Sequence, residues 1–315
     1  MHRYIKQAAK NIGFDACKIA QADYLSEDAA FFQRWLAEGK QGEMHYLERN
    51  AEKRYNPQVL VPGCKSVVVV LMNYFTQIEF PTNSPKLALY ACPAVDYHTV
   101  IKQKLSELET AVIEKYGKQI VNPDCQHIFV DSAPVLERRW AERAGLGWIG
   151  RNKQLIASEL GSYCFVGILL LNAETTYDTP VRNACGRCRK CIDACPTKAF
   201  SDSGFDARRC ISYQNIEKKG TIDSDMQTLL NSYIAGCDIC AKVCPWNKKW
   251  AKTHNHPELA ANSELADWNV KSWENLTEKQ YNNIFAKSAL SRLGFSKLKE
   301  NIQLVVDSKL KQIKT

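Results

Sequence analysis

Eight of the thirteen cysteines lie in one short stretch of the chain, between residues 185 and 244. The first run spells CxxCxxCxxxCP and comprises Cys185, Cys188, Cys191 and Cys195. The second spells CxxCxxxCP, the same pattern without its first cysteine, and comprises Cys237, Cys240 and Cys244. Cys210, between the two runs, supplies the eighth thiol. Cysteines three residues apart that end in Cys-Pro are typical of 4Fe-4S ligation, in which the fourth cysteine of a run reaches a second cluster.

The spacing therefore predicts two 4Fe-4S clusters, as in two-cluster bacterial ferredoxins. Because the last cysteine of each run binds the cluster of the other run, a crossover, the predicted ligands of the first cluster are Cys185, Cys188, Cys191 and Cys244. The predicted ligands of the second cluster are Cys195, Cys210, Cys237 and Cys240. The alternative is a pair of structural zinc sites, because CxxC pairs also hold zinc. Paired clusters carry single electrons at potentials down to roughly −700 mV, so difficult reductions are within reach.

The elements that must position these groups are of mixed type. Continuous apolar runs predict buried strands at 66–75 and 162–172, with a short strand at 127–130. Apolar residues at helical spacing predict a helix that Asp96 begins and Gly117 ends. Such a helix would cover a sheet. No GxGxxG or GxxxxGK pattern occurs before the cysteines, so no nucleotide-cofactor site is indicated.

Three segments are expected: 1–175 with a central sheet covered by helices, 176–252 with the clusters, and 253–315 as a helical tail. The fold class is α+β or α/β. The middle segment has few long apolar runs, so it needs covalent cross-links or bound metal to fold. In the first segment Asp131 follows a strand and precedes a helix, a place where α/β folds often carry chemistry.

The composition is that of a soluble globular chain, with 45% hydrophobic and 24% charged residues among 315. No apolar run approaches the roughly 20 residues that cross a bilayer. The first residues lack the apolar core and cleavage site of a signal peptide. We therefore expect a cytoplasmic protein without membrane contact.

Positive charge is concentrated in the cysteine-rich segment. The whole chain carries 42 basic and 34 acidic residues, and residues 181–252 contribute thirteen basic against seven acidic. This surplus predicts contact with a polyanion through Arg208, Arg209, Lys218, Lys219, Lys248 and Lys249. Trp246 and Trp250 could stack on exposed bases, although tryptophans are more often core residues. Alternatively, the lysines attract an acidic electron-carrier protein.

Further motifs resemble those of the epoxyqueuosine reductases, cobalamin-dependent iron-sulfur enzymes that complete queuosine synthesis on tRNA. The matching residues are 52–57 (EKRYNP), 96–98 (DYH), 131–138, 141–152 (AERAGLGWIGRN), 161–163 (GSY), the cysteine runs and 209–213 (RCISY). The resemblance implies that residues 1–175 bind cobalamin and hold the catalytic site. The chain looks like the short form of the family, without its C-terminal helical-repeat domain. Cys92-Pro93 stands where the family tends to have Arg-Gly.

The resemblance implies removal of the epoxide oxygen from epoxyqueuosine at the tRNA wobble position with two electrons and two protons. Reduced cobalamin suits this reaction because Co(I) is a strong nucleophile. The family places the proton donor at Asp131, whose pKa we expect burial to raise. Read from the residues alone, Asp131 is instead the N-cap of the helix that follows.

The residues that the resemblance assigns to cobalamin are Arg54, Asp131, Arg138, Lys153, Leu155, Tyr163 and Ser212. The alternatives are that the arginines are solvated or ion-paired and that Ser212 is a turn hydroxyl. The tripeptide Asp96-Tyr97-His98 imitates part of a cobalt-binding motif, but we interpret Asp96 as a helix cap. No protein imidazole is therefore expected below the cobalt.

The implied partners are tRNA containing epoxyqueuosine and a low-potential electron donor of the ferredoxin or flavodoxin type. Enzymes of this kind can act as monomers, so a monomer is expected. Two other functions are compatible with the sequence: a related reductive dehalogenase, and a ferredoxin-type electron-transfer protein without substrate chemistry.

Overall fold

The computed structural model describes residues 1–201 and 204–313. Its centre is a four-stranded sheet in the order β1-β2-β7-β4. The strands are β1 (Ala16–Gln21), β2 (Ser66–Asn73), β7 (Cys164–Leu171) and β4 (Ile128–Phe129). They confirm the three predicted strands. Every pairing is antiparallel, for example Val69 opposite Lys18 on one side and Ile168 on the other, so the α+β description applies.

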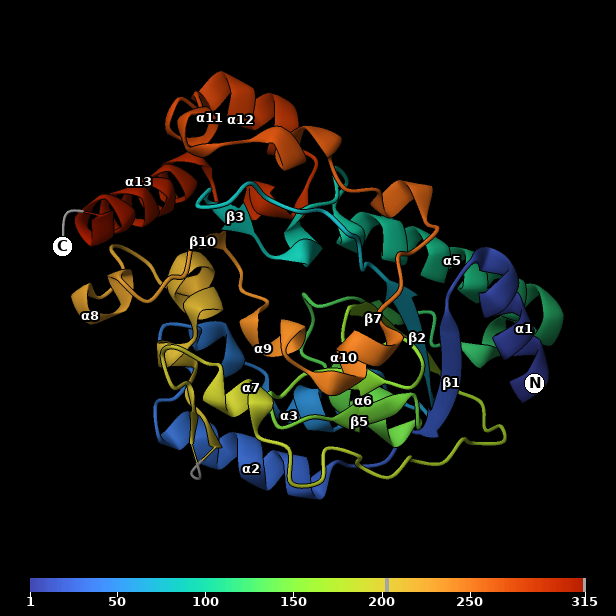
Figure 1. Cartoon of the computed structure of the whole chain (residues 1–315). Coiled ribbons are helices and arrows are strands. Elements are labelled where there is room, and N and C mark those ends of the chain that lie inside the picture. Colours follow the sequence, from blue (N-terminus) through green and yellow to red (C-terminus); the bar gives the residue numbers. More distant parts are fainter. Residues whose placement is uncertain (202–203, 314–315) are drawn as a thin grey trace.

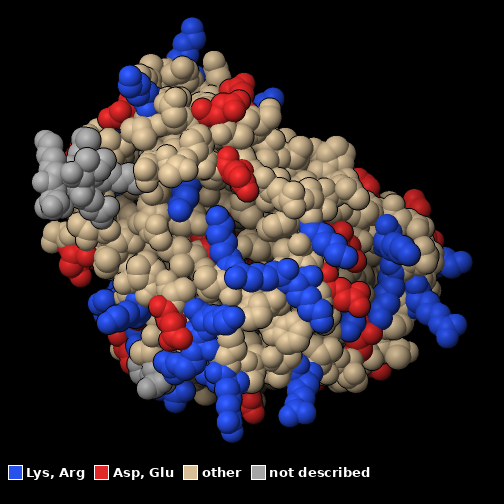
Figure 2. All heavy atoms as spheres, in the orientation of Figure 1, with Lys and Arg blue, Asp and Glu red and all other residues tan. Residues whose placement is uncertain are grey.

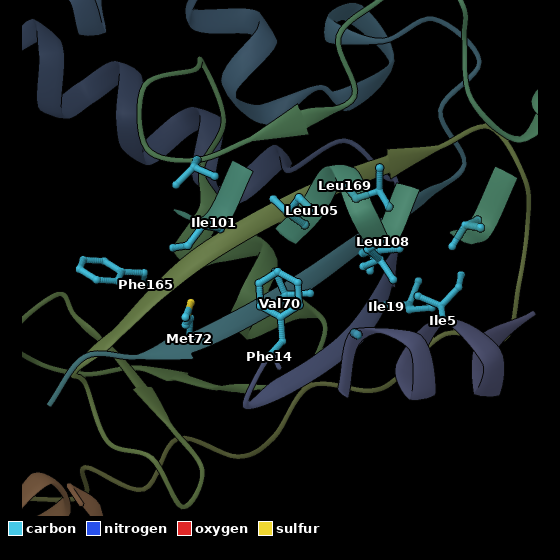
Figure 3. Packing of buried hydrophobic residues seen from close by; sticks show 14 of the residues in the cluster. Ile5, Phe14, Ile19, Val70, Met72, Ile101, Leu105, Leu108, Phe165 and Leu169 are labelled. Carbon is cyan, nitrogen blue, oxygen red and sulfur yellow. The ribbon is translucent and has the colours of Figure 1, made fainter. Parts of the chain in front are cut away.

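Helices cover both faces of this sheet, which explains why all eight residues of β2 are buried and read as one apolar run. On one face α1 (His2–Ile12) and α5 (Tyr97–Tyr116) pack against Val70, Met72 and Leu169 (Figure 3). On the other face the apolar core takes in Ala29 of α2 (Ser26–Ala37), Tyr55 of α3 (Ala51–Tyr55) and Trp140 of α6 (Glu137–Arg143). The two layers are visible to either side of the strands in Figure 1.

Helix α5 begins and ends where the sequence predicts. The Asp96 carboxylate accepts a hydrogen bond from the backbone N–H of His98 at 2.9 Å, and Gly117 ends the helix with φ 90°. These contacts satisfy groups that a helix terminus leaves unpaired. The cap also places Tyr97 and His98 in the first turn.

The cysteine-rich segment is built from short elements. They are α7 (Lys190–Asp193), β8 (Phe200–Ser201), β9 (Gly204–Phe205), η4 (Ala207–Arg209), the π-helix η5 (Tyr213–Glu217), α8 (Ser224–Gln227), β10 (Tyr233–Ala235), α9 (Ile239–Lys242) and α10 (Pro245–Trp250). Strand β10 pairs in parallel with β3 (Lys86–Leu87), so the module is joined to the first segment by backbone hydrogen bonds.

The tail comprises η6 (Pro257–Leu259), η7 (Ser263–Asp267), α11 (Val270–Glu274), α12 (Glu278–Phe285), η8 (Ala289–Arg292) and α13 (Phe295–Ile313). It lies over β3 and β10 (Figure 1). One apolar core combines Leu87, Ile234 and Trp273, one residue from each expected segment. The Asn301 amide donates to the carbonyls of Asn215 and Ile234 at 2.8 and 2.9 Å, which anchors α13 to the cluster module. The two segment boundaries stay a prediction, and apolar contacts and hydrogen bonds join the segments on either side of each.

The remaining elements connect these parts. They are η1 (His45–Leu47), α4 (Pro57–Leu60), η2 (Leu89–Ala91), η3 (Lys118–Ile120), β5 (Gly147–Ile149) and β6 (Leu155–Ala157). Within the residues that the structure describes, no helix has the length and apolar character that spanning a membrane requires.

Candidate active site and cluster ligands

Asp131 follows β4 in the left-handed backbone region, with φ 55°. A non-glycine residue there is strained by about 1 kcal/mol or more, and such residues cluster at functional sites. One of its carboxylate oxygens accepts the Tyr97 hydroxyl at 2.7 Å and lies 3.5 Å from Nε2 of His98. The N-cap alternative is wrong, because α6 begins at Glu137 with Leu136 at its N-cap.

His98 lies between two carboxylates. Its Nδ1 is 2.7 Å from Asp96, and its Nε2 faces Asp131. Burial alone lowers the pKa of His98, but the hydrogen bonds to Asp131 and Asp96 raise it to about 9. The imidazole is therefore protonated at neutral pH.

The same contact corrects our expectation for Asp131. The hydrogen bond with His98 lowers the pKa of Asp131 to about 2, even though burial acts in the raising direction. The predicted raised pKa is therefore wrong for the protein in this form. The physical reason is the protonated imidazole beside the carboxylate, which stabilises its charged form.

Tyr97 is held rigidly in this arrangement. Its ring stacks on Phe165 with centroids 3.9 Å apart and an interplanar angle of 4°. Burial and the neighbouring Asp131 carboxylate raise the pKa of the Tyr97 hydroxyl far above its usual value, so it remains a donor. Sequence reasoning correctly assigned the cap to Asp96 but missed Tyr97 and His98, although both belong to the matched DYH motif.

Two further ionisable groups contain unsatisfied atoms: Glu137, whose charge interacts with that of Asp131, and Arg54, which lies near Glu137. Arg54 of α3 is 8% exposed and donates from Nη2 to the Tyr46 carbonyl at 3.0 Å. Its Nε, like Oε1 of Glu137, is buried without a hydrogen-bond partner among the described residues. Burial raises the pKa of Glu137 to about 8, so this carboxyl is largely neutral at pH 7. Unpaired buried polar atoms are rare and commonly indicate a bound group.

Several thiols of each predicted quartet lie near one another, although among the described residues no group of three or more His, Cys, Asp or Glu side chains is arranged to hold a metal ion. Burial raises the pKa of the Cys191 thiol, and Cys185 and Cys244 lie close enough to add to the effect. In the other quartet, burial raises the pKa of Cys237, and the nearby thiols of Cys210 and Cys240 contribute. Cys191 of the first quartet also lies near Cys240 of the second, so this proximity does not separate the two quartets, and the crossover assignment stays a prediction.

Hydrogen bonds also reach the sulfur atoms. The indole N–H of Trp148 donates to Cys185 at 3.4 Å, and the backbone N–H of Ala199 donates to Cys195 at 3.4 Å. The backbone N–H groups of Tyr213 and Ser212 hydrogen-bond to the sulfur of Cys210, whose pKa burial raises. Such bonds tune cluster potentials.

Comparison with known proteins agrees with this geometry. Residues 184–247 match the family model of a 4Fe-4S double cluster binding domain, and residues 54–132 match that of epoxyqueuosine reductase QueG, DUF1730. The epoxyqueuosine reductase of Leadbetterella byssophila is 40% identical over 301 residues, which cover 96% of this chain and 97% of that protein. The chain belongs to the epoxyqueuosine reductase family.

Solved structures of epoxyqueuosine reductases share the fold. One was crystallised with an epoxyqueuosine-modified tRNA-Tyr stem loop and matches with a TM-score of 0.84 and 28% identity over 97% of this chain and 80% of that chain. Another, from Bacillus subtilis, has an aspartate-bearing catalytic loop swung out of its active site. It matches with a TM-score of 0.82 and 28% identity over 97% of this chain and 81% of that chain.

The other residues that the family resemblance assigns to cobalamin lie in different settings. Arg138 donates to the Lys153 carbonyl at 3.2 Å, and the Lys153 ammonium lies 5.8 Å from the ring centroid of Phe31. Ser212 lies against the Cys210 sulfur. Leu155 and Tyr163 are buried, and Tyr163, 2% exposed, packs against Phe75. The side chains of these two have little surface left for a ligand, so their assignment gains no support.

The predicted phosphate contacts also differ among themselves. Arg208 is engaged by both oxygens of Asp206, and Lys218 pairs with Asp223 at 3.0 Å. Arg209 donates to the carbonyl of Thr197. Lys219 and Lys248 are exposed. These findings favour Lys219 and Lys248 over the two arginines and Lys218.

Basic side chains extend over the face formed by α7, α9 and α10 (Figure 2). Lys249 of α10 is exposed, and its ammonium lies 5.8 and 5.9 Å from the ring centroids of Trp246 and Trp250. Both tryptophans pack edge-on against the buried Trp148, which favours the core alternative for them.

Proposed function

We propose that this chain reduces epoxyqueuosine to queuosine at the wobble position of tRNA. The reaction removes the epoxide oxygen as water and consumes two electrons and two protons. The observation that carries the proposal is the Tyr97-His98-Asp131 arrangement, in a chain of the epoxyqueuosine reductase family that also matches a 4Fe-4S double cluster binding domain. Together they support a reduction in which protein side chains supply protons and bound clusters supply electrons.

The residues around Asp131 fit a cobalamin. A corrin carries amide groups at its edge, and these can satisfy the unpaired buried Nε of Arg54 and Oε1 of Glu137. Arg54, Arg138, Lys153 and Ser212 are the residues that would hold it. When bound, cobalamin supplies a strongly reducing, nucleophilic cobalt centre that can act on a strained epoxide ring.

Proton delivery follows from the charges of the chain's own groups. At neutral pH His98 carries a proton and Asp131 is ionised. Covering Asp131 with bound groups would remove water and raise its pKa, which favours transfer of the His98 proton to the carboxylate. Asp131 then protonates the oxygen that leaves the substrate, while the Tyr97 hydroxyl holds the carboxylate in place.

Glu137 is a candidate source for the second proton. Its carboxyl is largely protonated at neutral pH, and the nearby negative charge of Asp131 helps to raise its pKa. General acid catalysis by a positioned group typically contributes about 10²- to 10⁴-fold in rate.

The two cysteine quartets would hold the 4Fe-4S clusters, which would supply single electrons at low potential. The surplus of basic side chains in residues 181–252 favours an acidic, low-potential carrier of the ferredoxin or flavodoxin type. We expect the chain to act as a monomer in the cytoplasm, where tRNA is modified.

The test is a turnover assay with protein that carries both cofactors and has been reduced under anaerobic conditions. It is given tRNA that contains epoxyqueuosine, and the product is digested to nucleosides and separated. We expect queuosine to replace its epoxide. Unchanged epoxide, with cluster and cobalamin absorbance both present, would overturn the proposal.

A further inference from the structure

The loop that carries Cys185 and Cys188 is strongly basic. Residues 179–192 contain four basic side chains and no acidic one, and all four are exposed: Arg182, Arg187, Arg189 and Lys190. Arg189 lies 3.7 Å from the Asp193 carboxylate, whereas none of the other three forms an ion pair with a described residue. Three positive charges therefore face solvent beside the predicted ligands of the first cluster.

Hydrogen bonds from neighbouring elements fix the backbone of this loop. Arg151, which follows β5, donates to the carbonyl of Gly186 at 2.9 Å. The indole N–H of Trp246 in α10 donates to the carbonyl of Ala184 at 3.2 Å. A loop held in this way presents its charges at set positions, which lowers the entropy lost when a partner binds.

The basic surface continues onto the elements that hold the loop. Arg151 and Lys249 are exposed, and the Lys249 ammonium lies 5.8 Å from the ring centroid of Trp246, the same indole that bonds to the loop. Figure 2 shows basic side chains over the face that α7 and α10 form. We call the following residues the basic rim: Arg151, Arg182, Arg187, Lys190 and Lys249.

The predicted second quartet lies deeper in the protein. Gly236 and Asp238, on either side of Cys237, are buried, whereas both chain neighbours of Cys185 are exposed. Electron transfer between proteins becomes slower as the distance between the redox groups grows. A protein that delivers electrons from solution therefore approaches the first quartet more closely than the second.

We propose that an acidic protein that carries single electrons docks on the basic rim. The inference rests on the proposed function, because the reduction of one epoxide consumes two electrons. Each encounter oxidises one carrier by one electron and reduces the cluster that the first quartet would hold, with no covalent bond formed or broken. Two encounters therefore serve one reduction. Complementary charge steers such encounters and fixes their orientation.

The test measures binding of flavodoxin, an acidic one-electron carrier, to the holoenzyme by titration calorimetry at low ionic strength. The variant Arg187→Gln with Lys190→Gln removes two charges of the basic rim, and we expect its Kd to rise about tenfold. The difference should shrink as added salt screens the charges. An unchanged Kd would overturn the inference.

A matched control removes the same net charge elsewhere. Lys115→Gln with Lys118→Gln changes exposed positions in α5 and η3, and we expect its Kd to change by less than about twofold. Equal weakening in the rim variant and in this control would show that flavodoxin responds only to net charge, which would overturn the inference.

Two further variants separate docking from cluster assembly. Arg187→Lys with Lys190→Arg keeps both charges and should bind flavodoxin as the wild type does. Arg182→Gln with Lys249→Gln changes rim residues that do not adjoin a cysteine, and it should weaken binding about as much as the first rim variant. Iron content and visible absorbance check that each variant retains its clusters. Normal flavodoxin binding by this second neutralised variant would overturn the inference.

Binding of a tRNA anticodon stem loop distinguishes the carrier from the other polyanion. Phosphate groups are also attracted by positive charge, but they gain nothing from a position over the cluster thiols. Both neutralised rim variants should keep wild-type affinity for the stem loop. A loss of stem-loop affinity equal to the loss of flavodoxin affinity would make the rim a general anion-binding surface and overturn the inference.

The source of electrons separates this inference from the proposed function. With a small chemical reductant, the rim variants should convert epoxyqueuosine tRNA at the wild-type rate, whereas with limiting flavodoxin they should be slower. Equal rates with limiting flavodoxin overturn the docking surface alone. Absence of turnover by the wild type with the chemical reductant overturns the proposed function.

Discussion

Nε2 of His98 lies 3.5 Å from the Asp131 carboxylate oxygen that also accepts the Tyr97 hydroxyl. The pKa of His98 is raised from 6.5 to about 9, so its contribution to stability is present below pH 6.5 and lost as the pH rises through 9. The pKa of Asp131 is lowered from 3.8 to about 2, so its contribution is present above pH 3.8 and lost as the pH falls through 2. The charged pair is therefore intact across the neutral range.

Replacing His98 tests its role as the proton source. We expect His98→Gln to lower kcat by about 10²- to 10⁴-fold, because the carboxylate loses its donor. Wild-type kcat should fall as the pH rises through about 9, and kcat of the variant should not show this decrease. Single-turnover rates across the alkaline range measure both effects. His45→Gln, at an exposed position, is the matched control. An unaltered pH profile in His98→Gln would remove the imidazole from the mechanism.

Asp131→Asn should retain cobalamin and lose turnover. Asparagine tolerates the left-handed backbone of this position, so the fold should persist. Without the carboxylate, the pKa of His98 should fall toward its usual value, which NMR titration of the imidazole measures without any substrate. Full activity in this variant, or an unchanged His98 pKa, would contradict the proposed relay.

Glu137→Gln tests the second protonated group. The pKa of Glu137 is raised from 4.5 to about 8, so its favourable contribution to stability is present below pH 4.5 and lost as the pH rises through 8. The free energy of unfolding of the variant should therefore depend less on pH in this interval than that of the wild type. Denaturant titrations at several pH values measure the difference. Parallel curves would show that the carboxyl is not held neutral.

Removal of one cluster ligand should affect one cluster. Cys195→Ser is expected to lose about half of the bound iron, because the other quartet keeps its four thiolates. Cys125→Ser, outside both quartets, should keep all of it. Iron content and visible absorbance of anaerobically purified protein provide the comparison. Full iron occupancy in Cys195→Ser would contradict the assignment.

Phosphate contacts are tested by the salt dependence of tRNA binding. Lys219→Ala and Lys248→Ala should each weaken binding and reduce the slope of log affinity against log salt by about one. Arg208→Ala should have a smaller effect, because Asp206 already engages its guanidinium. Equal effects of all three variants would show that the ion pair opens on binding.

Much of the fold was predictable from local patterns. Asp96 and Gly117 bound α5 because capping chemistry is a property of neighbouring residues, and the apolar run at β2 indicates a strand covered on both faces. The cysteine spacing likewise predicted the double-cluster module, because ligands three residues apart can reach one cluster from a single short segment.

The proton path was not predictable in this way. Tyr97 and Asp131 are 34 residues apart, and only the packing of α5 beside β4 brings them within hydrogen-bonding distance. Burial suggested a raised pKa for Asp131, but the direction of the shift is decided by the protonated His98 beside it. The charge of His98 depends in turn on the carboxylates of Asp96 and Asp131. The sequence by itself determined which elements form and predicted which thiols bind metal, because both follow from local spacing. The tertiary structure alone decided which charges meet, because electrostatic interactions depend on distance in space and not on distance along the chain.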